Sequence, residues 1–381
     1  MDKYIKNILT IILSITLAAF LYVVYNTITP LIDNSFKSFI YTNLWFVKLA
    51  ILIVGNIIIF LFYFIIAPHL VDYFSNKSIK YPDNYENLYK QLHNIYYPIL
   101  KKLQNKILLK EASKTSLIFS AFLSYLMLGS DVIFTLLSLG IVLIIFGIVY
   151  FATKSASLEY VEIYKTKIIS SMVQSLNSNF KYIQTVPDQQ VAKNLYDQSK
   201  LFVPYYDSLF ADDYIKSYIG NNIPIQIFNI ITKRLIYSTR KRIGFNGLLI
   251  IADIDCNTSN GIIVTRRSLP YEGSYIFVQT TNQEFEKNFA IFSDNKIFAT
   301  YIFTPDILNF INDFYKLHKL DFEFSFHDKK MYFKFNTGDT FEPNIIGNPI
   351  NKLSLYTYYY TLDFIIEFVK KISNIMNSLG N

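Results

Sequence analysis

The sequence contains a single cysteine, Cys256, which excludes an internal disulfide and any zinc or iron–sulfur site built from cysteines of one chain. Its four histidines, His69, His93, His318 and His327, do not pair at a spacing typical of metal ligands. An HExxH motif, a glycine-rich phosphate loop and a Gly-x-Ser-x-Gly motif are also missing. The sequence therefore predicts no catalytic residues, no cofactor and no metal site.

Charged residues are scarce as well. They make up 17% of the 381 residues, whereas about a quarter is usual for soluble proteins. The net charge is +7, and residues 1–154, with 13 lysines and 7 acids, contribute +6 of it. A nucleic-acid-binding domain carries a basic surface of its own, whereas positive charge beside apolar segments is typical of membrane proteins. We therefore expect no nucleic-acid partner.

Long apolar runs are confined to the first 154 residues, where they cover 8–25, 49–66, 115–129 and 132–152. Runs of about 18 apolar residues can cross a bilayer. No small-x-small cleavage triplet follows the first run, which therefore resembles a retained anchor more than a signal peptide. No ionisable residue lies in the middle of a run, so a transporter or channel is not favoured. The pattern predicts four transmembrane helices arranged as two hairpins, with the lipid bilayer as a partner.

The lysine distribution predicts the orientation of these helices. Residues 26–47 contain one lysine and residues 69–114 contain eight, which places segment 69–114 and both termini on the cytoplasmic side. Apolar residues at steps of three and four in this segment predict an amphipathic helix that Pro98 kinks or splits. Such a helix either lies on anionic lipid or packs against its own domain.

The rest of the chain predicts a soluble α+β domain, because the apolar spacing changes from helical to alternating near residue 213. Two hairpins are expected, one joining 289–292 to 297–303 and one joining 322–326 to 331–335. Thr304, as N-cap, and Pro305 predict a helix that ends near His318. A last helix over 353–376 is expected to pack on the sheet. The fold class is thus membrane α-helical plus a soluble α+β domain, whose mainly antiparallel sheet has helices on one side.

These predictions divide the chain into five parts. They are a first transmembrane hairpin (1–68), a basic cytoplasmic helical loop (69–114), a second transmembrane hairpin (115–154), a helical stalk (155–186) and the soluble α+β domain (187–381).

Four short motifs in the soluble domain carry a family resemblance. They are Gly244-Phe-Asn-Gly-Leu-Leu-Ile-Ile-Ala-Asp, Glu284-Phe-Glu-Lys-Asn-Phe-Ala-Ile-Phe-Ser-Asp, Ala299-Thr-Tyr-Ile-Phe-Thr-Pro-Asp and Phe341-Glu-Pro. Their succession resembles a bacterial family known as domain of unknown function 3137, over residues 100–350. The resemblance implies a multi-pass protein of the bacterial inner membrane, and it brings no reaction, cofactor or catalytic residue.

All five arginines of the chain, Arg234, Arg240, Arg242, Arg266 and Arg267, lie within 34 positions, near two predicted strand ends. The planar guanidinium suits phosphate and carboxylate groups. The arginines therefore form a candidate site for an anion or a lipid headgroup. The alternative is a solvated face of a hairpin.

Together these features predict a non-enzymatic membrane protein. Its cytoplasmic α+β domain would bind a protein partner or anionic lipid headgroups, in a scaffold or sensor role. The alternative is a membrane-associated enzyme that acts on a phosphate-bearing lipid or envelope substrate, with arginines holding the phosphate.

Overall fold

The computed structural model describes residues 44–69, 81–126, 132–201, 206–220, 222–237, 240–254, 261–267, 275–338 and 340–379. The chain forms two compact units. The helical unit comprises Met1–Pro82, Tyr89–Ile163 and Pro343–Asn351. The sheet unit comprises Asp83–Leu88, Tyr164–Glu342 and Lys352–Asn381. Each unit is described by itself below.

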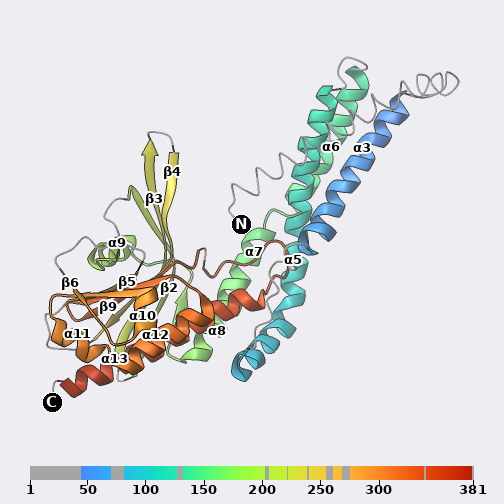
Figure 1. Ribbon diagram of the computed structural model, residues 1–381. Helices are drawn as coiled ribbons and strands as arrows, with labels where there is room; N and C mark the ends of the chain where they lie inside the picture. The colour runs from blue at the N-terminus through green and yellow to red at the C-terminus, as the bar shows by residue number, and fades with distance from the viewer. Residues whose placement is uncertain are drawn as a thin grey trace. The chain divides into compact units, whose positions relative to one another are not determined.

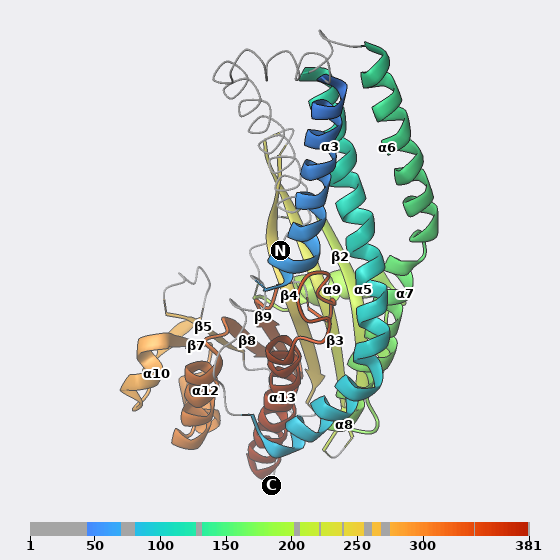
Figure 2. The ribbon, with the colours of Figure 1, turned by 90° about the vertical axis from the view of Figure 1, so that its right-hand side faces the viewer.

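Among the described residues of the helical unit, three long helices run alongside one another (Figure 2). The described helices from the start of the chain to the first strand are α3 (Leu44–Leu61), the π-helical turn η2 (Phe62–Ile66), α5 (Asp83–Leu126), α6 (Val132–Ala152), α7 (Ala156–Ile163), the π-helical turn η3 (Tyr164–Ile169) and α8 (Ser170–Leu176). The last two belong to the sheet unit.

Two helical stretches of the described chain, Ile51–His69 and Gly140–Leu176, are long and apolar enough to cross a membrane. They contain most of the predicted runs 49–66 and 132–152. Run 8–25 lies outside the described residues. The described part of run 115–129 forms the end of the 44-residue α5, which is not one of the two stretches. Two of the four predicted membrane helices thus have the length and composition that crossing requires.

Helices α3 and α5 pack closely because a glycine faces an aromatic ring. A Cβ atom on Gly55 of α3 would lie 2.2 Å from Cζ of Phe119 of α5, whose side chain is fully buried. Phe119 belongs to a buried apolar cluster that also includes Ile59, Tyr63 and Leu123. The absence of a side chain at position 55 therefore allows the ring to lie against the α3 backbone.

Helix α5 continues through Pro98, so of the two predicted effects of this proline, a kink or a split, the split does not occur. Part of the predicted apolar stripe, including Leu103, is buried, whereas Ile95 and Ile99 are exposed. On the buried side, Gln104 Nε2 donates hydrogen bonds to the carbonyl oxygens of Asn344, at 3.1 Å, and of Gly347, at 3.0 Å. The helix therefore packs against its own chain, as one of the two sequence interpretations expects.

The sheet unit contains a nine-stranded sheet in the order β1-β2-β3-β4-β9-β8-β5-β7-β6 (Figure 1). Every strand pair in it is antiparallel, which confirms the predicted α+β class. The strands are β1 (Lys181–Ile183), β2 (Ser208–Ile219), β3 (Ile223–Tyr237), β4 (Arg240–Asp253), β5 (Ile262–Arg266), β6 (Ile276–Val278), β7 (Phe289–Ser293), β8 (Phe322–His327) and β9 (Lys330–Phe335). The predicted hairpin over 322–335 is confirmed as β8 and β9.

One face of the sheet is covered by α12 (Pro305–His318) and α13 (Lys352–Leu379), as Figure 1 shows. The ring of Phe314 in α12 stacks on Phe364 in α13, with centroids 3.9 Å apart. Phe314 also contacts Phe322 of the sheet edge-on. The apolar residues at helical spacing along one side of α13 are all buried, as packing on the sheet requires: Leu355, Tyr359, Leu362, Ile366, Val369 and Ile372.

The opposite face of the sheet is covered by α9 (Gln189–Gln198), so the prediction of helices on only one side is wrong. Asp188 caps α9, because its side chain accepts a hydrogen bond from the Gln190 backbone N–H. Tyr196 then packs on Phe245 of β4, with ring centroids 6.2 Å apart. Strand residues alternate between the two faces, so a strand buried on both faces needs helices on both.

The predicted hairpin over 289–303 is also wrong in its second half. Phe289–Ser293 forms β7, and two short helices flank it, α10 (Gln283–Asn288) and α11 (Lys296–Ile302). The side chain of Asn295 accepts a hydrogen bond from the Phe298 backbone N–H and so caps α11. The aromatic and β-branched residues of segment 297–303 are typical of a strand. The Asn295 cap and the burial of one side of α11 nevertheless stabilise a helix there.

Candidate functional site

An apolar surface lies at one edge of the sheet, where β6 ends the strand order and α11 packs beside it. Ile297 and Tyr301 lie four residues apart on one side of α11 and are 81% and 59% exposed. Ile276 of β6 is 56% exposed. We call these three residues and the pocket beside them the β6–α11 surface. Exposed apolar side chains gathered in this way are typical of an interaction site.

The pocket of the β6–α11 surface has a volume of about 470 Å³. Val278 and Ile291 line it from neighbouring strands, and Tyr301 lines it from α11. Threonine side chains and the start of α12 at Pro305 complete the wall. The lining therefore combines apolar side chains with several threonines, a combination suited to holding an apolar side chain.

The structure divides the five predicted arginines between two places. Arg234 lies near the end of β3, and Arg240 and Arg242 lie at the start of β4. Arg266 ends β5, and Arg267 follows it. Strands β9 and β8 separate β4 from β5, and the arginines of β4 lie beyond Leu248, where the pairing with β9 ends. Arg242 lies six residues before Leu248 along β4, a distance of about 20 Å. The fold therefore does not bring the two groups together.

Arg266 is engaged within the domain. Its Nη2 donates a hydrogen bond to the Tyr315 hydroxyl at 2.7 Å, and its Nε lies 3.4 Å from Asp321. The guanidinium also stacks over the Tyr315 ring, 4.1 Å from the centroid. Arg267 instead lies over Phe277 on the other face of the sheet edge, at 5.2 Å. Anion binding by the arginines stays a prediction, and of the two residues only Arg267 is exposed.

A buried ion cluster in the same domain was not predicted from the sequence. Lys165 of η3 has a side chain only 2% exposed, and its Nζ lies 3.1 Å from Asp213 and 3.3 Å from Asp212. It also pairs with Glu342, which follows β9 in the chain. The two aspartates occupy an irregularity of β2, between residues paired to Ile230 and Phe228 of β3. A π-helical turn and a β-bulge therefore meet at one charged group.

Asp213 is the most perturbed carboxyl group of this cluster. Burial raises its pKa from 3.8 to about 6, although the ammonium of Lys165 and the hydroxyl of Tyr182 act in the opposite direction. Tyr182 of β1 donates a hydrogen bond to Asp213, and burial together with the nearby carboxylates raises the pKa of its hydroxyl. Carboxylate oxygens of Asp212, Asp213 and Glu342 lie within 4.8 Å of one another. The Lys165 ammonium contacts all three and supplies the positive charge that they require.

Two sequence signals could have indicated this cluster. Lys165 stands within the helical stripe that includes Tyr164, Ile168 and Met172, all of them buried. The adjacent acids Asp212 and Asp213 interrupt a strand whose other residues are largely apolar. A lysine on the buried side of a helix requires an acidic partner, but the spacing does not say where in the chain that partner lies.

The motifs that carry the family resemblance have structural explanations. A Cβ atom on Gly247 would lie 2.0 Å from the carbonyl oxygen of Phe335, so the contact between β4 and β9 requires glycine there. Phe341 adopts a positive φ of 63° and is buried against Tyr182 and Tyr358. This conformation turns the chain so that Glu342 reaches Lys165. The motifs therefore specify the domain's architecture.

These features define a protein with an α+β domain built on a large antiparallel sheet, together with two helical stretches in the described part of the chain that are long and apolar enough to cross a membrane. Residues 243–374 match the model of the family described as "Protein of unknown function (DUF3137)", which confirms the resemblance for this part of the chain. No match was found among curated proteins or among solved structures.

Proposed function

We propose that the protein is a multi-pass protein of the bacterial inner membrane that binds a partner protein through the β6–α11 surface of its α+β domain. The four apolar runs anchor the chain, and the lysine-rich segment 69–114 places the domain and both termini in the cytoplasm. The observation that carries the proposal is the exposure of Ile297 and Tyr301 on α11 and of Ile276 on the neighbouring β6, together with the pocket that Tyr301 lines. The role is that of a scaffold or sensor.

Because the β6–α11 surface lies at an edge strand, it favours one kind of partner segment. An extended peptide can add to a free strand edge through main-chain hydrogen bonds, while its alternate side chains enter neighbouring pockets. β6 offers the edge, and the pocket lined by Val278 and Tyr301 accepts an apolar side chain. The partner segment is therefore extended and carries an apolar residue at the position facing this pocket.

The alternative function, an enzyme acting on a phosphate-bearing substrate, receives less support from the geometry. It requires the arginines to act on one ligand, and the fold separates Arg240 and Arg242 from Arg266 and Arg267. Within the described residues, the side chain of Arg266 is occupied by Tyr315 and Asp321. We therefore favour binding over catalysis.

Site-specific photocrosslinking in cells tests the proposed surface. A photoreactive amino acid replaces Ile297 in the full-length protein, and in a control it replaces Leu317, which is 57% exposed at the end of α12. We expect a discrete heterologous adduct at position 297 that Tyr301→Asp removes, and none at position 317. Equal labelling at both positions, or an adduct that persists with Tyr301→Asp, refutes the surface. Reporter fusions at the C-terminus test the topology, and an external C-terminus refutes the cytoplasmic placement.

A further inference from the structure

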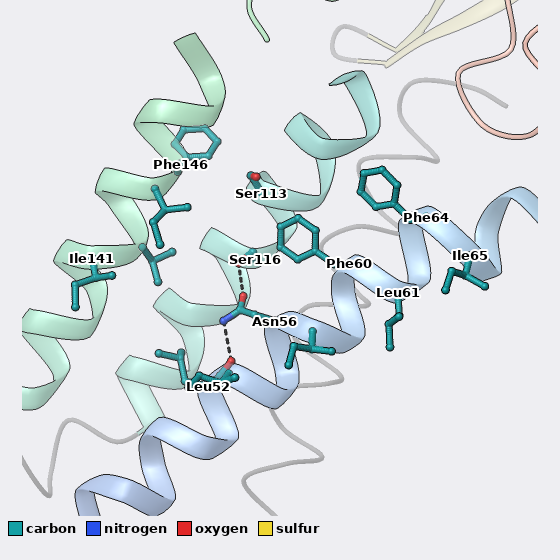
Figure 3. A pocket seen from close by; sticks show the side chains of 14 residues that line it. Leu52, Asn56, Phe60, Leu61, Phe64, Ile65, Ser113, Ser116, Ile141 and Phe146 are labelled. Carbon is teal, nitrogen blue, oxygen red and sulfur yellow. Dashed lines mark hydrogen bonds between the residues drawn. The ribbon is translucent and has the colours of Figure 1, made fainter. Parts of the chain in front are cut away.

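A groove between α3, α5 and α6 has the lining of a site for a lipid chain (Figure 3). Its volume is about 640 Å³, within the range of ligand-binding cavities. Eleven of its fourteen lining side chains are aliphatic or aromatic, and Phe60, Phe64 and Phe146 are among them. All fourteen lining residues belong to the helical unit, and those of α6 and of the segment from α3 to η2 lie within the two stretches able to cross a membrane.

The groove also contains a hydroxyl group to which the described part of the chain offers no hydrogen-bond partner. The Ser116 hydroxyl donates a hydrogen bond to Oδ1 of Asn56, and Nδ2 of Asn56 donates one to the Leu52 carbonyl oxygen at 2.8 Å (Figure 3). Ser113 lines the same groove and is only 4% exposed, yet its Oγ has no hydrogen-bond partner among the described residues. A hydroxyl buried among apolar side chains is costly unless it is hydrogen-bonded. The occupant of the groove should therefore bring an acceptor to Ser113.

One end of the groove carries positive charge. Lys110 lies three residues before Ser113, on the same side of α5, and its Nζ is 4.9 Å from the centroid of the Tyr150 ring. Tyr150 in turn lies against Phe146 of the groove, with ring centroids 6.0 Å apart. The neighbouring Glu111 pairs with Lys114 at 3.2 Å, which leaves the Lys110 charge without an ion pair among the described residues. Basic residues where membrane helices meet the cytoplasmic interface attract anionic headgroups.

We propose that this groove binds one anionic glycerophospholipid, with an acyl chain between α3 and α6, an ester carbonyl accepting a hydrogen bond from Ser113 and the phosphate beside Lys110. The order of the groups along α5 matches the order within such a lipid, in which the charged phosphate, the ester and the hydrocarbon follow one another. The inference rests on the membrane anchoring proposed above, but it does not depend on the β6–α11 surface.

The test uses the full-length protein in phosphatidylcholine nanodiscs that contain a photoreactive phospholipid with a diazirine in its acyl chain. The headgroup of the probe is either phosphatidylglycerol or phosphatidylcholine, and the labelled residues are mapped by mass spectrometry. We expect the phosphatidylglycerol probe to label the groove residues of α3 and α6 several times more than the phosphatidylcholine probe does. Lys110→Gln should abolish this preference.

Two tryptophan variants provide the matched comparison. Ile145 lines the groove, whereas the adjacent Ile144 is 65% exposed and does not. Ile145→Trp should fill the groove and reduce its labelling several-fold, and Ile144→Trp should leave it unchanged. Ser113→Ala, which leaves the volume almost unaltered, should weaken labelling roughly fivefold at limiting probe, since one hydrogen bond is lost. This variant keeps the test valid if Ile145→Trp does not fold.

Three results would overturn the inference. Labelling that is equal for both headgroups and insensitive to Ser113→Ala and Ile145→Trp means that only bulk lipid touches the helices. A groove that stays unlabelled while the outer face at Ile144 is labelled means that something else, such as run 8–25 of this chain, fills it. If neither the groove nor the outer face at Ile144 is labelled, the proposed membrane anchoring is refuted. This result differs from the two above, which refute only the lipid site in the groove.

Discussion

The ammonium group of Lys165 lies 3.1 Å from a carboxylate oxygen of Asp213, and both side chains are almost completely buried. This ion pair joins a π-helical turn to an irregular position of β2, and Glu342 extends it to the segment that follows β9. Buried charges persist only when they are paired, so the position of each element depends on the others. The cluster therefore holds together three segments that are distant in the sequence.

Replacing Lys165 by methionine should destabilise the sheet unit by about 3 kcal/mol, because buried carboxylates would lose their counter-charge. Urea denaturation of the full-length protein in detergent, followed by the tyrosine signal, measures the change. Lys216→Met is the control, since Lys216 is exposed on the same strand as Asp213. The exposed substitution should change the free energy of unfolding by less than about 0.5 kcal/mol. Equal effects of the two substitutions would contradict a structural role of the cluster.

The raised pKa of Asp213 predicts a specific pH dependence. The folded protein holds the Asp213 proton with a pKa of about 6, whereas 3.8 is the ordinary value expected in the unfolded chain. Protonation therefore favours the folded state, and this contribution is complete below pH 4 and is lost as the pH rises through 6. The free energy of unfolding of the native protein, relative to that of Asp213→Asn, should increase on acidification from pH 6 to pH 4. The slope should be at most about 1.4 kcal/mol per pH unit. A difference that stays constant over this interval would rule out the titration of Asp213.

Gly55→Ala should weaken the packing of α3 on α5. The added Cβ would lie 2.2 Å from the Phe119 ring, so the helices or the ring must move, at a cost of about 1–3 kcal/mol. Gly140→Ala in α6 is the matched control, because no atom of the described residues lies within 4 Å of its added Cβ. The control should stabilise its helix by up to about 1 kcal/mol. Thermal unfolding in detergent measures both changes, and the additional substitution Phe119→Leu should restore part of the stability lost in Gly55→Ala.

Phe314→Ala should be among the most damaging single changes to the sheet unit. The ring is 2% exposed and stacks on Phe364, so its removal leaves a cavity that costs about 3–5 kcal/mol. Phe277→Ala, at the exposed sheet edge, should cost less than about 1 kcal/mol. The comparison uses the free energies of unfolding of the two purified variants. Similar losses in both would mean that the edge at β6 is covered in solution.

Several elements could be predicted because the sequence contains the physical signal that determines them. The spacing of Leu355, Leu362 and Val369 specifies the buried side of α13, and Pro305 after Thr304 specifies the start of α12. The polar segment between Phe326 and Met331 specifies the β8–β9 turn. These signals are local, since each depends on residues within a few turns or one hairpin.

The remaining features depend on which distant segments meet. The residues of α11 have the composition of a strand, and packing against β6 and α13 together with the Asn295 cap makes them helical. The five arginines are close in sequence, yet β9 and β8 enter the sheet between the strands that carry them.

The sequence by itself determined two of the apolar helices, the antiparallel α+β class and the family resemblance of residues 243–374, because hydrophobic periodicity and motif order are properties of the chain alone. Only the tertiary structure decided that α9 covers the second face of the sheet, that Lys165 meets Asp213 and Glu342, and that Ser113 faces an apolar groove. The physical reason is that a periodic pattern specifies which side of an element is buried, whereas the residue that covers it is selected by the folding of the whole chain.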